Sequence, residues 1–229
     1  MAPRGQARGG ERPDLPPEGE SAPEPGWLEP GLEQEFPGLG IFTTTVDAGG
    51  GRSPEALRER LRELSDRVAG QEAILLRQRP IPWAYRVFFR QIGLDPDSTR
   101  TPPEELMLDR IKGGRLKSHG RVEDAIAIAV AETGVAVHAF DAAQVEGRLG
   151  LRISTEKERF AGRVSPLPPG TMVIADERRP LAVLFRAVAE GVEAGRGRER
   201  TTLAAIRVKG VPDVAVEEAL WLAASAMLA

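Results

Sequence analysis

A run of basic side chains in the middle of the chain could contact phosphate groups. Together with His119, it consists of Arg110, Lys112, Arg115, Lys117 and Arg121. Gly113, Gly114 and Gly120 lie among them, and glycine lets the backbone approach a ligand closely. Several cations on one short segment are typical of contacts with RNA or another phosphate ligand. The structural alternative is a cationic helix end that complements the helix dipole.

Four side chains between residues 124 and 141 could also carry chemistry. His138 could orient a water molecule or a ribose hydroxyl, and it could equally be a structural histidine that bonds to backbone. Asp124 and Glu132 flank a helix that is apolar on nearly all faces, so their carboxylates need a helix cap or an arginine as partner. Asp141 follows a predicted strand and could simply open the next turn.

The common catalytic signatures are absent from the sequence. It has no Cys, which excludes disulfides and thiolate chemistry, and its two His argue against a multi-histidine metal site. It contains no P-loop, no Gly-x-Gly-x-x-Gly after a strand, no nucleophile elbow and no His-Glu-x-x-His. We therefore predict no metal and no cofactor.

The acidic charge is concentrated near the N-terminus. The chain of 229 residues has a net charge of −3, of which residues 1–37 carry −5 and the remainder +2. Residues 1–37 hold eight Pro and six Gly, and they have too few large apolar side chains to offset the entropy of ordering. We predict a disordered tail over residues 1–37 and a single folded domain over 38–229. No apolar stretch is long enough for a membrane span or a secretion signal, so we expect a cytoplasmic protein.

Helix signals come early in the folded part and strand signals come late. Ser53 and Pro54 favour a helix start, and Thr101 and Glu104 form a capping box for another helix. The helix over 122–132 is apolar on nearly all faces and is predicted to be buried. Short strands are predicted at 149–153, 172–175, 181–185 and 203–208. This order favours an α+β fold.

The segment from Asp124 to Asp141 resembles a known motif. Asp124 and Glu132 are followed by Gly134 and by His-Ala-Phe-Asp at 138–141. The B3/B4 tRNA-editing domain of the phenylalanyl-tRNA synthetase beta subunit carries a Val-Asp-x-Thr-Asn helix and then Glu-x-Gly-Gln-Pro-x-His-Ala-Phe-Asp. The similarity resumes with Met-Val-Ile-Ala-Asp at 172–176. It covers about residues 70–228, including stretches that look like stand-alone synthetase-beta-related proteins.

The resemblance implies an α+β fold with a mixed sheet flanked by helices. It also implies a tRNA partner, His138 as the catalytic residue, and a pocket formed by Asp124, Ile126, Ala127, Glu132 and Asp141. We therefore expect a stand-alone aminoacyl-tRNA binding protein that could hydrolyse mischarged tRNA. The aminoacylation and anticodon-binding modules of the synthetase are absent, so we do not expect a ligase, and we expect no DNA or membrane partner.

The departures from the family fall on the chemistry. The Thr-Asn pair is replaced by Ile126 and Ala127, and the Gly-Gly-Glu that follows an Ile-Phe strand is replaced by Arg-Ala-Val at 186–188. A pocket lined by Ile126 and Ala127 is more apolar and lacks hydrogen bonds that would discriminate a hydroxyl. The alternative is a non-catalytic module that binds tRNA, an amino acid or a small metabolite.

Overall fold

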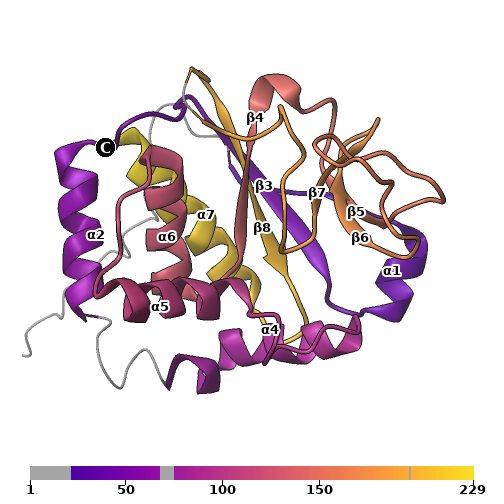
Figure 1. Cartoon of the computed structure of the whole chain (residues 1–229), viewed down its shortest axis with the longest axis horizontal. Coiled ribbons are helices and arrows are strands. Elements are labelled where there is room, and N and C mark those ends of the chain that lie inside the picture. The colour runs from indigo at the N-terminus through magenta and orange to yellow at the C-terminus, as the bar shows by residue number, and fades with distance from the viewer. Residues whose placement is uncertain (1–21, 68–74, 196) are drawn as a thin grey trace, which may run out of the picture.

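Two four-stranded sheets organise the residues that the computed structural model describes, which are 22–67, 75–195 and 197–229 (Figure 1). The first sheet is antiparallel, in the order β1 (Glu24–Pro25), β3 (Gly40–Val46), β8 (Thr201–Arg207) and β4 (Val137–Asp141). The second is mixed, in the order β2 (Trp27–Leu28), β5 (Gly150–Ile153), β6 (Met172–Ala175) and β7 (Pro180–Val183). The predicted α+β fold is confirmed, although the strands form two sheets instead of one.

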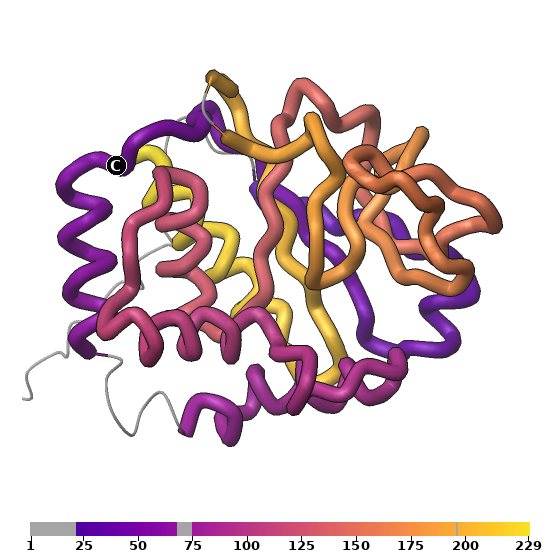
Figure 2. The backbone as a smooth tube through the Cα atoms, in the orientation of Figure 1, coloured from indigo at the N-terminus to yellow at the C-terminus, as the bar shows by residue number. Residues whose placement is uncertain are grey.

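The helices include three that pack in successive layers against the first sheet. In the part of the chain that is described they are α1 (Pro30–Glu35), α2 (Glu55–Arg67), α4 (Pro80–Gln91), α5 (Pro102–Gly113), α6 (Arg121–Thr133) and α7 (Asp213–Leu228). Short 3₁₀ turns occur at Leu76–Gln78 and Ala142–Gln144. α7 lies against β3 and β8, α6 packs on α7, and α2 packs on α6 (Figure 2). None of these helices is long and apolar enough to cross a bilayer.

The ends of α5 and α6 follow their local sequence signals. α5 begins at the predicted capping box, in which the backbone N–H and the hydroxyl of Thr101 donate to the Glu104 carboxylate over 3.3 and 3.0 Å. α5 and α6 end at Gly114 and Gly134, whose φ angles of 71° and 76° favour glycine. These signals fix where the connection between the two helices begins, and that connection forms part of the site described below.

Residues 22–37 correct the prediction of a disordered tail over 1–37, whose first 21 residues lie outside the described ranges. β1 pairs with β3, β2 pairs with β5, and α1 buries Leu32. The indole N–H of Trp27 donates to the Arg148 carbonyl over 2.8 Å. The ring of Trp27 lies so close to Gly150 that a Cβ atom there would meet it at 2.0 Å. Composition alone misses this order because the rest of the domain supplies the backbone and side-chain partners.

Tyr85 connects α4 to the first sheet. Its side chain is fully buried, and its hydroxyl donates to the carbonyl of Ile206 in β8 over 2.5 Å. The same hydroxyl accepts the backbone N–H of Ala136 over 3.0 Å, and burial raises the pKa of the phenol. One side chain therefore provides hydrogen bonds to two buried backbone groups.

Replacing Tyr85 by Phe removes only this hydroxyl. The variant leaves the Ala136 N–H and the Ile206 carbonyl without that partner, so we expect the free energy of unfolding to fall by about 1–3 kcal/mol. Urea denaturation measures the loss, and an unchanged m value would show that the unfolded state is unaffected. A loss below roughly 0.5 kcal/mol would contradict a net contribution from these bonds.

Candidate functional site

Three cavities adjoin along residues 115–120, which connect α5 to α6. The first has a volume of about 490 Å³ and is lined by three of the predicted RNA-binding side chains, Lys112, Arg115 and Lys117. The second, of about 350 Å³, shares Arg115 and Lys117 and adds Arg58 of α2. The third, of about 500 Å³, shares Arg58 with the second and His119 with the first. We call these adjoining cavities the basic groove, defined by Arg52, Arg58, Arg62, Lys112, Arg115, Lys117 and His119.

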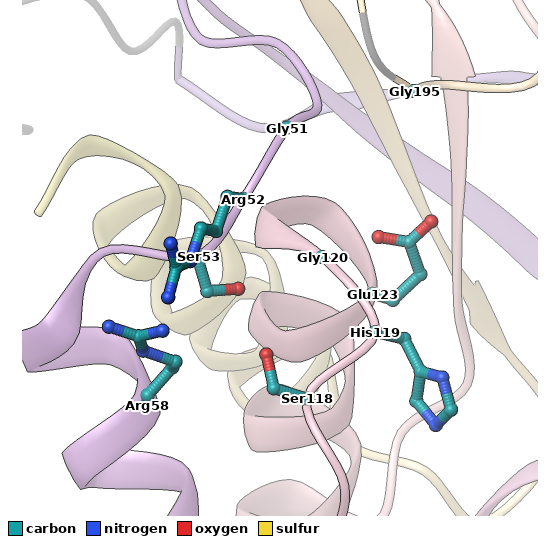
Figure 3. A pocket seen from close by; sticks show the side chains of 9 residues that line it. All are labelled: Gly51, Arg52, Ser53, Arg58, Ser118, His119, Gly120, Glu123 and Gly195. Carbon is teal, nitrogen blue, oxygen red and sulfur yellow. The ribbon is translucent and has the colours of Figure 1, made fainter.

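Figure 3 shows the third cavity of the basic groove. Its lining residues are Gly51, Arg52, Ser53, Arg58, Ser118, His119, Gly120, Glu123 and Gly195. The guanidinium groups of Arg52 and Arg58 lie on one side of it, and the side chains of His119 and Glu123 lie on the other. The cavity therefore combines residues from the start of α2, the connection to α6, the first turn of α6 and the loop that precedes β8.

Two members of the predicted RNA-binding cluster, Arg110 and Arg121, do not line these cavities. The Arg110 guanidinium donates to the Ser65 and Gly114 carbonyls, each over 2.8 Å, and so ties α5 to α2. Arg121 is half-buried at the first position of α6, and its Nε is buried. The local cluster thus divides into exposed groove residues and residues that hold the helices in place.

Asp124 is a buried carboxylate that joins the walls of the groove. It accepts hydrogen bonds from the hydroxyls of Ser53 and Ser118 over 2.6 and 2.5 Å, and from the backbone N–H of His119 over 2.9 Å. Ser53, which we predicted at the start of a helix, lies two residues before α2, and its hydroxyl donates to Asp124. Asp124 and Ala127, both predicted pocket residues, line the first cavity.

Two other predicted pocket residues lie apart from the groove. Glu132, at the end of α6, pairs with Arg60 and Arg67 of α2 over 3.4 and 3.2 Å. It lines a separate cavity of about 470 Å³ next to Pro82 and Gly134. Ile126 is half-buried and packs against the core. The arginine partner considered for Glu132 is thus present in the structure.

Asp141, the last predicted pocket residue, is buried at the end of β4. Its Oδ1 accepts the backbone N–H of Ala143 over 3.2 Å, and the Arg198 guanidinium lies 3.0 Å from Oδ2. Asp141 therefore opens the 3₁₀ turn that follows β4. Across residues 22–67, 75–195 and 197–229, no three His, Asp or Glu side chains gather as a metal-binding group.

His138 lies on β4, with α6 as the neighbouring helix. Its ring stacks on Phe140 at 6.3 Å between centroids and contacts Phe185 at 6.4 Å. Burial lowers the pKa of His138 from 6.5 to about 4. Its imidazole is therefore neutral at pH 7, where it can donate one hydrogen bond and accept another.

Threonines share the sheet face of His138. Residues directly opposite in an antiparallel sheet lie on one face; the register places Thr43, Ala204 and His138 in one row. The next row on that face contains Thr45, Thr202 and Phe140, and the two threonine hydroxyls are hydrogen-bonded over 3.2 Å. His138 therefore belongs to a partly polar sheet surface, whereas the predicted pocket residues lie mainly on α6.

Phe185, two residues after the end of β7, adopts a strained backbone conformation. Its φ angle is +58°, which is costly for a bulky side chain, about 1–3 kcal/mol. The ring packs against Tyr85, Phe88 and Phe89, with centroid distances of 5.7, 6.1 and 5.2 Å, as well as against His138. This aromatic packing offsets the strain and closes one side of the surroundings of His138.

The B3/4 domain model matches residues 84–220, from α4 into α7. This segment contains the α5–α6 connection, α6 and β4, and it is more than half of the 229 residues. The chain therefore belongs to the B3/4 domain family, which confirms the resemblance found in the sequence.

The chain is also similar to parts of curated proteins. It is 28% identical over 137 residues to the phenylalanine–tRNA ligase beta subunit of Pseudomonas syringae pv. syringae (strain B728a), covering 56% of this chain and 17% of that protein. It is 31% identical over 80 residues to the phenylalanine–tRNA ligase beta subunit of Legionella pneumophila (strain Paris), covering 34% of this chain and 10% of that protein. The chain thus matches less than a fifth of the length of each of these two relatives. We conclude that it is related to a tRNA-synthetase subunit.

No local signal in the sequence marks Arg52 or Arg58 as site residues. They lie about sixty residues before the cluster at 112–119, and only the fold brings them next to it. The Gly-Gly-Gly run at 49–51 is the one nearby hint, since glycine permits close approach of backbones. Gly50 does lie against Gly195, where a Cβ atom would meet the backbone at 2.2 Å.

The lowered pKa of His138 predicts a pH dependence of stability. Between pH 6.5 and about 4 the unfolded chain binds a proton at this site that the folded chain does not. The contribution of His138 to stability is therefore complete above pH 6.5 and is lost as the pH falls toward 4. We expect urea denaturation to show a loss of about 1–3 kcal/mol over this range that His138→Gln lacks. Equal slopes in wild type and His138→Gln would contradict the prediction.

Proposed function

We propose that this protein binds tRNA through the basic groove. The observation that supports this best is the gathering of Lys112, Arg115 and Lys117 with arginines of α2 around adjoining cavities. Arginine and lysine contacts to phosphates supply most of the affinity of proteins for nucleic acids. Membership of the B3/4 family and similarity to a tRNA-ligase subunit favour tRNA over other anionic polymers.

The charges in the groove support contacts with a phosphate backbone. Lys112, Arg115 and Lys117 are exposed, and the structure shows no ion pair for any of the three among the residues it describes. Asp109 and Glu123 are the carboxylates that line the first cavity beside the buried Asp124. The exposed cations can therefore turn toward RNA without first breaking an ion pair.

The double variant Arg115→Gln/Lys117→Gln should weaken tRNA binding. If each side chain contacts one phosphate, the slope of log affinity against log salt should decrease in magnitude by about 1.4–1.8. Fluorescence anisotropy with labelled tRNA at several salt concentrations measures both effects. The control Arg186→Gln/Lys209→Gln removes two exposed charges outside the groove and should bind as wild type does. Wild-type affinity in the groove variant would contradict the proposal.

A second candidate function is hydrolysis of the ester of a mischarged tRNA. The observation that favours it is His138, a neutral imidazole on β4, the strand that contacts α6. The alternative is a binding module without catalysis, and the structural roles of Asp124, Glu132 and Asp141 favour it.

In the hydrolytic case, water attacks the ester carbonyl and the ribose hydroxyl leaves with the proton that the water gives up. A histidine with a pKa of about 4 is a weak general base at pH 7. We therefore assign His138 to positioning the water or the terminal ribose hydroxyl by hydrogen bonds. Backbone N–H groups would stabilise the developing oxyanion, and no protein nucleophile takes part.

Single-turnover deacylation of a panel of aminoacyl-tRNAs, including Tyr-tRNA(Phe), tests the catalytic candidate. We expect His138→Ala to slow hydrolysis by about 10-fold or more, as for the loss of a hydrogen-bonding group in a transition state. Because His138 is neutral above pH 5, the rate should show no step near pH 6.5. The groove variant should raise the tRNA concentration needed for half-maximal rate. If the wild-type protein hydrolyses none of these aminoacyl-tRNAs, the remaining candidate is the binding module without catalysis.

A further inference from the structure

Two arginines lie on one wall of the third cavity of the basic groove. The guanidinium groups of Arg52 and Arg58 lie on the same side of a space of about 500 Å³ (Figure 3). This volume is within the usual range for sites that enclose a small ligand, about 300–1,000 Å³. A pair of guanidinium groups suits a doubly charged anion, because each can form parallel hydrogen bonds to phosphate oxygens.

Both arginines have donors available for a ligand. Arg52 is exposed and forms no ion pair or side-chain hydrogen bond with any residue in the described part of the chain. Arg58 pairs with Glu55 through a terminal nitrogen, and its Nε is buried without a hydrogen-bond partner. The pair with Glu55 leaves the other terminal nitrogen of Arg58 as a donor for an anion.

Backbone contacts build the cavity independently of any ligand. The Arg121 N–H donates to the Gly51 carbonyl over 2.9 Å, and the Gly50 N–H donates to the Gly195 carbonyl over 3.1 Å. Gly51 and Gly120 have φ angles of 152° and 153°, which other residues rarely adopt. The walls are thus fixed by backbone hydrogen bonds and by glycines that leave the backbone open to a ligand.

The wall opposite the arginines carries different chemistry. His119 and Glu123 are exposed there, whereas the hydroxyls of Ser53 and Ser118 already donate to Asp124. Glu123 would repel a second phosphate but can accept a hydrogen bond from a sugar hydroxyl. The cavity is therefore polarised, with cations on one side and a carboxylate acceptor on the other.

We propose that this cavity binds a phosphate monoester carried by a ribose. Arg52 and Arg58 hold the phosphate, and Glu123 accepts a ribose hydroxyl. A monoester carries about −1.5 to −2 charges at pH 7, which two guanidinium groups match better than they match the single charge of a phosphodiester. Two sources share this chemistry: a free mononucleotide, and the 5′-phosphate end of an RNA. Of these two, only the 5′-phosphate end of an RNA depends on the proposed binding of tRNA.

Titration calorimetry with adenosine 5′-monophosphate and with adenosine tests the site. We expect the monophosphate to bind at least tenfold more tightly than adenosine, and inorganic phosphate to compete with it. Arg52→Gln should reduce the affinity for the monophosphate at least tenfold, and Arg186→Gln, an exposed arginine outside the cavity, should leave it unchanged. Glu123→Gln should weaken binding of the monophosphate while leaving competition by inorganic phosphate intact.

A second experiment distinguishes a free mononucleotide from the 5′-phosphate end of an RNA as the ligand. One RNA hairpin is prepared with a 5′-phosphate and with a 5′-hydroxyl, and its binding to wild type and Arg52→Gln is compared. Tighter binding of the phosphorylated hairpin that Arg52→Gln abolishes assigns the site to an RNA end. Equal binding of both hairpins, with mononucleotide binding retained, assigns it to a free nucleotide. Mononucleotide binding without any binding of tRNA would reject the proposed function and keep this site.

The proposal is overturned if Arg52→Gln changes neither measurement. It is also overturned if adenosine and its monophosphate bind equally, and the two hairpins bind equally, because recognition would then not depend on the phosphate. Circular dichroism of Arg52→Gln checks that the variant is folded, which we expect because Arg52 is exposed and has no described partner.

Discussion

The carboxylate of Asp124 holds together three segments that are distant in sequence. It sits in the first turn of α6, and it accepts hydrogen bonds from Ser53 ahead of α2 and from Ser118 and His119 in the connection from α5. A buried charge is tolerated only when such donors surround it, so the three segments have one arrangement that satisfies it. This arrangement brings Arg52 on one segment and His119 on another to the same cavity.

Signals that act within a few residues predicted much of the helical part of the fold. The Thr101 capping box and the glycines after α5 and α6 act through neighbouring backbone groups, so their effect does not depend on the rest of the chain. The ordered structure of residues 22–37 could not be predicted from such local signals. Trp27 and its neighbours are ordered by β5 and by the Arg148 carbonyl, more than a hundred residues further along the chain.

The candidate site likewise has one part that could be predicted from the local sequence and one part that depends on distant contacts. Lys112, Arg115 and Lys117 are neighbours in sequence, and their grouping on the surface could be predicted from composition. Arg52 and Arg58 join them only through the packing of α2 on α6. The carboxylates at 124, 132 and 141 show the converse, because each was a candidate for chemistry by its residue type, yet each has partners that hold the fold together. Residue type indicates what a side chain can do, and its partners decide what it does.

The pairing of β3 with β8 has a consequence for how the chain folds during synthesis. Gly40 pairs with Arg207, so a strand made early must wait for one made more than 160 residues later. β8 lies between β3 and β4, and neither strand has its main partner until β8 leaves the ribosome. Contacts this distant slow folding, and open strand edges can pair with other chains in the meantime. The nascent chain therefore exposes the β3 edge from early in synthesis until β8 is made, and the β4 edge from residue 141 until then, which is the interval in which a chaperone would protect it.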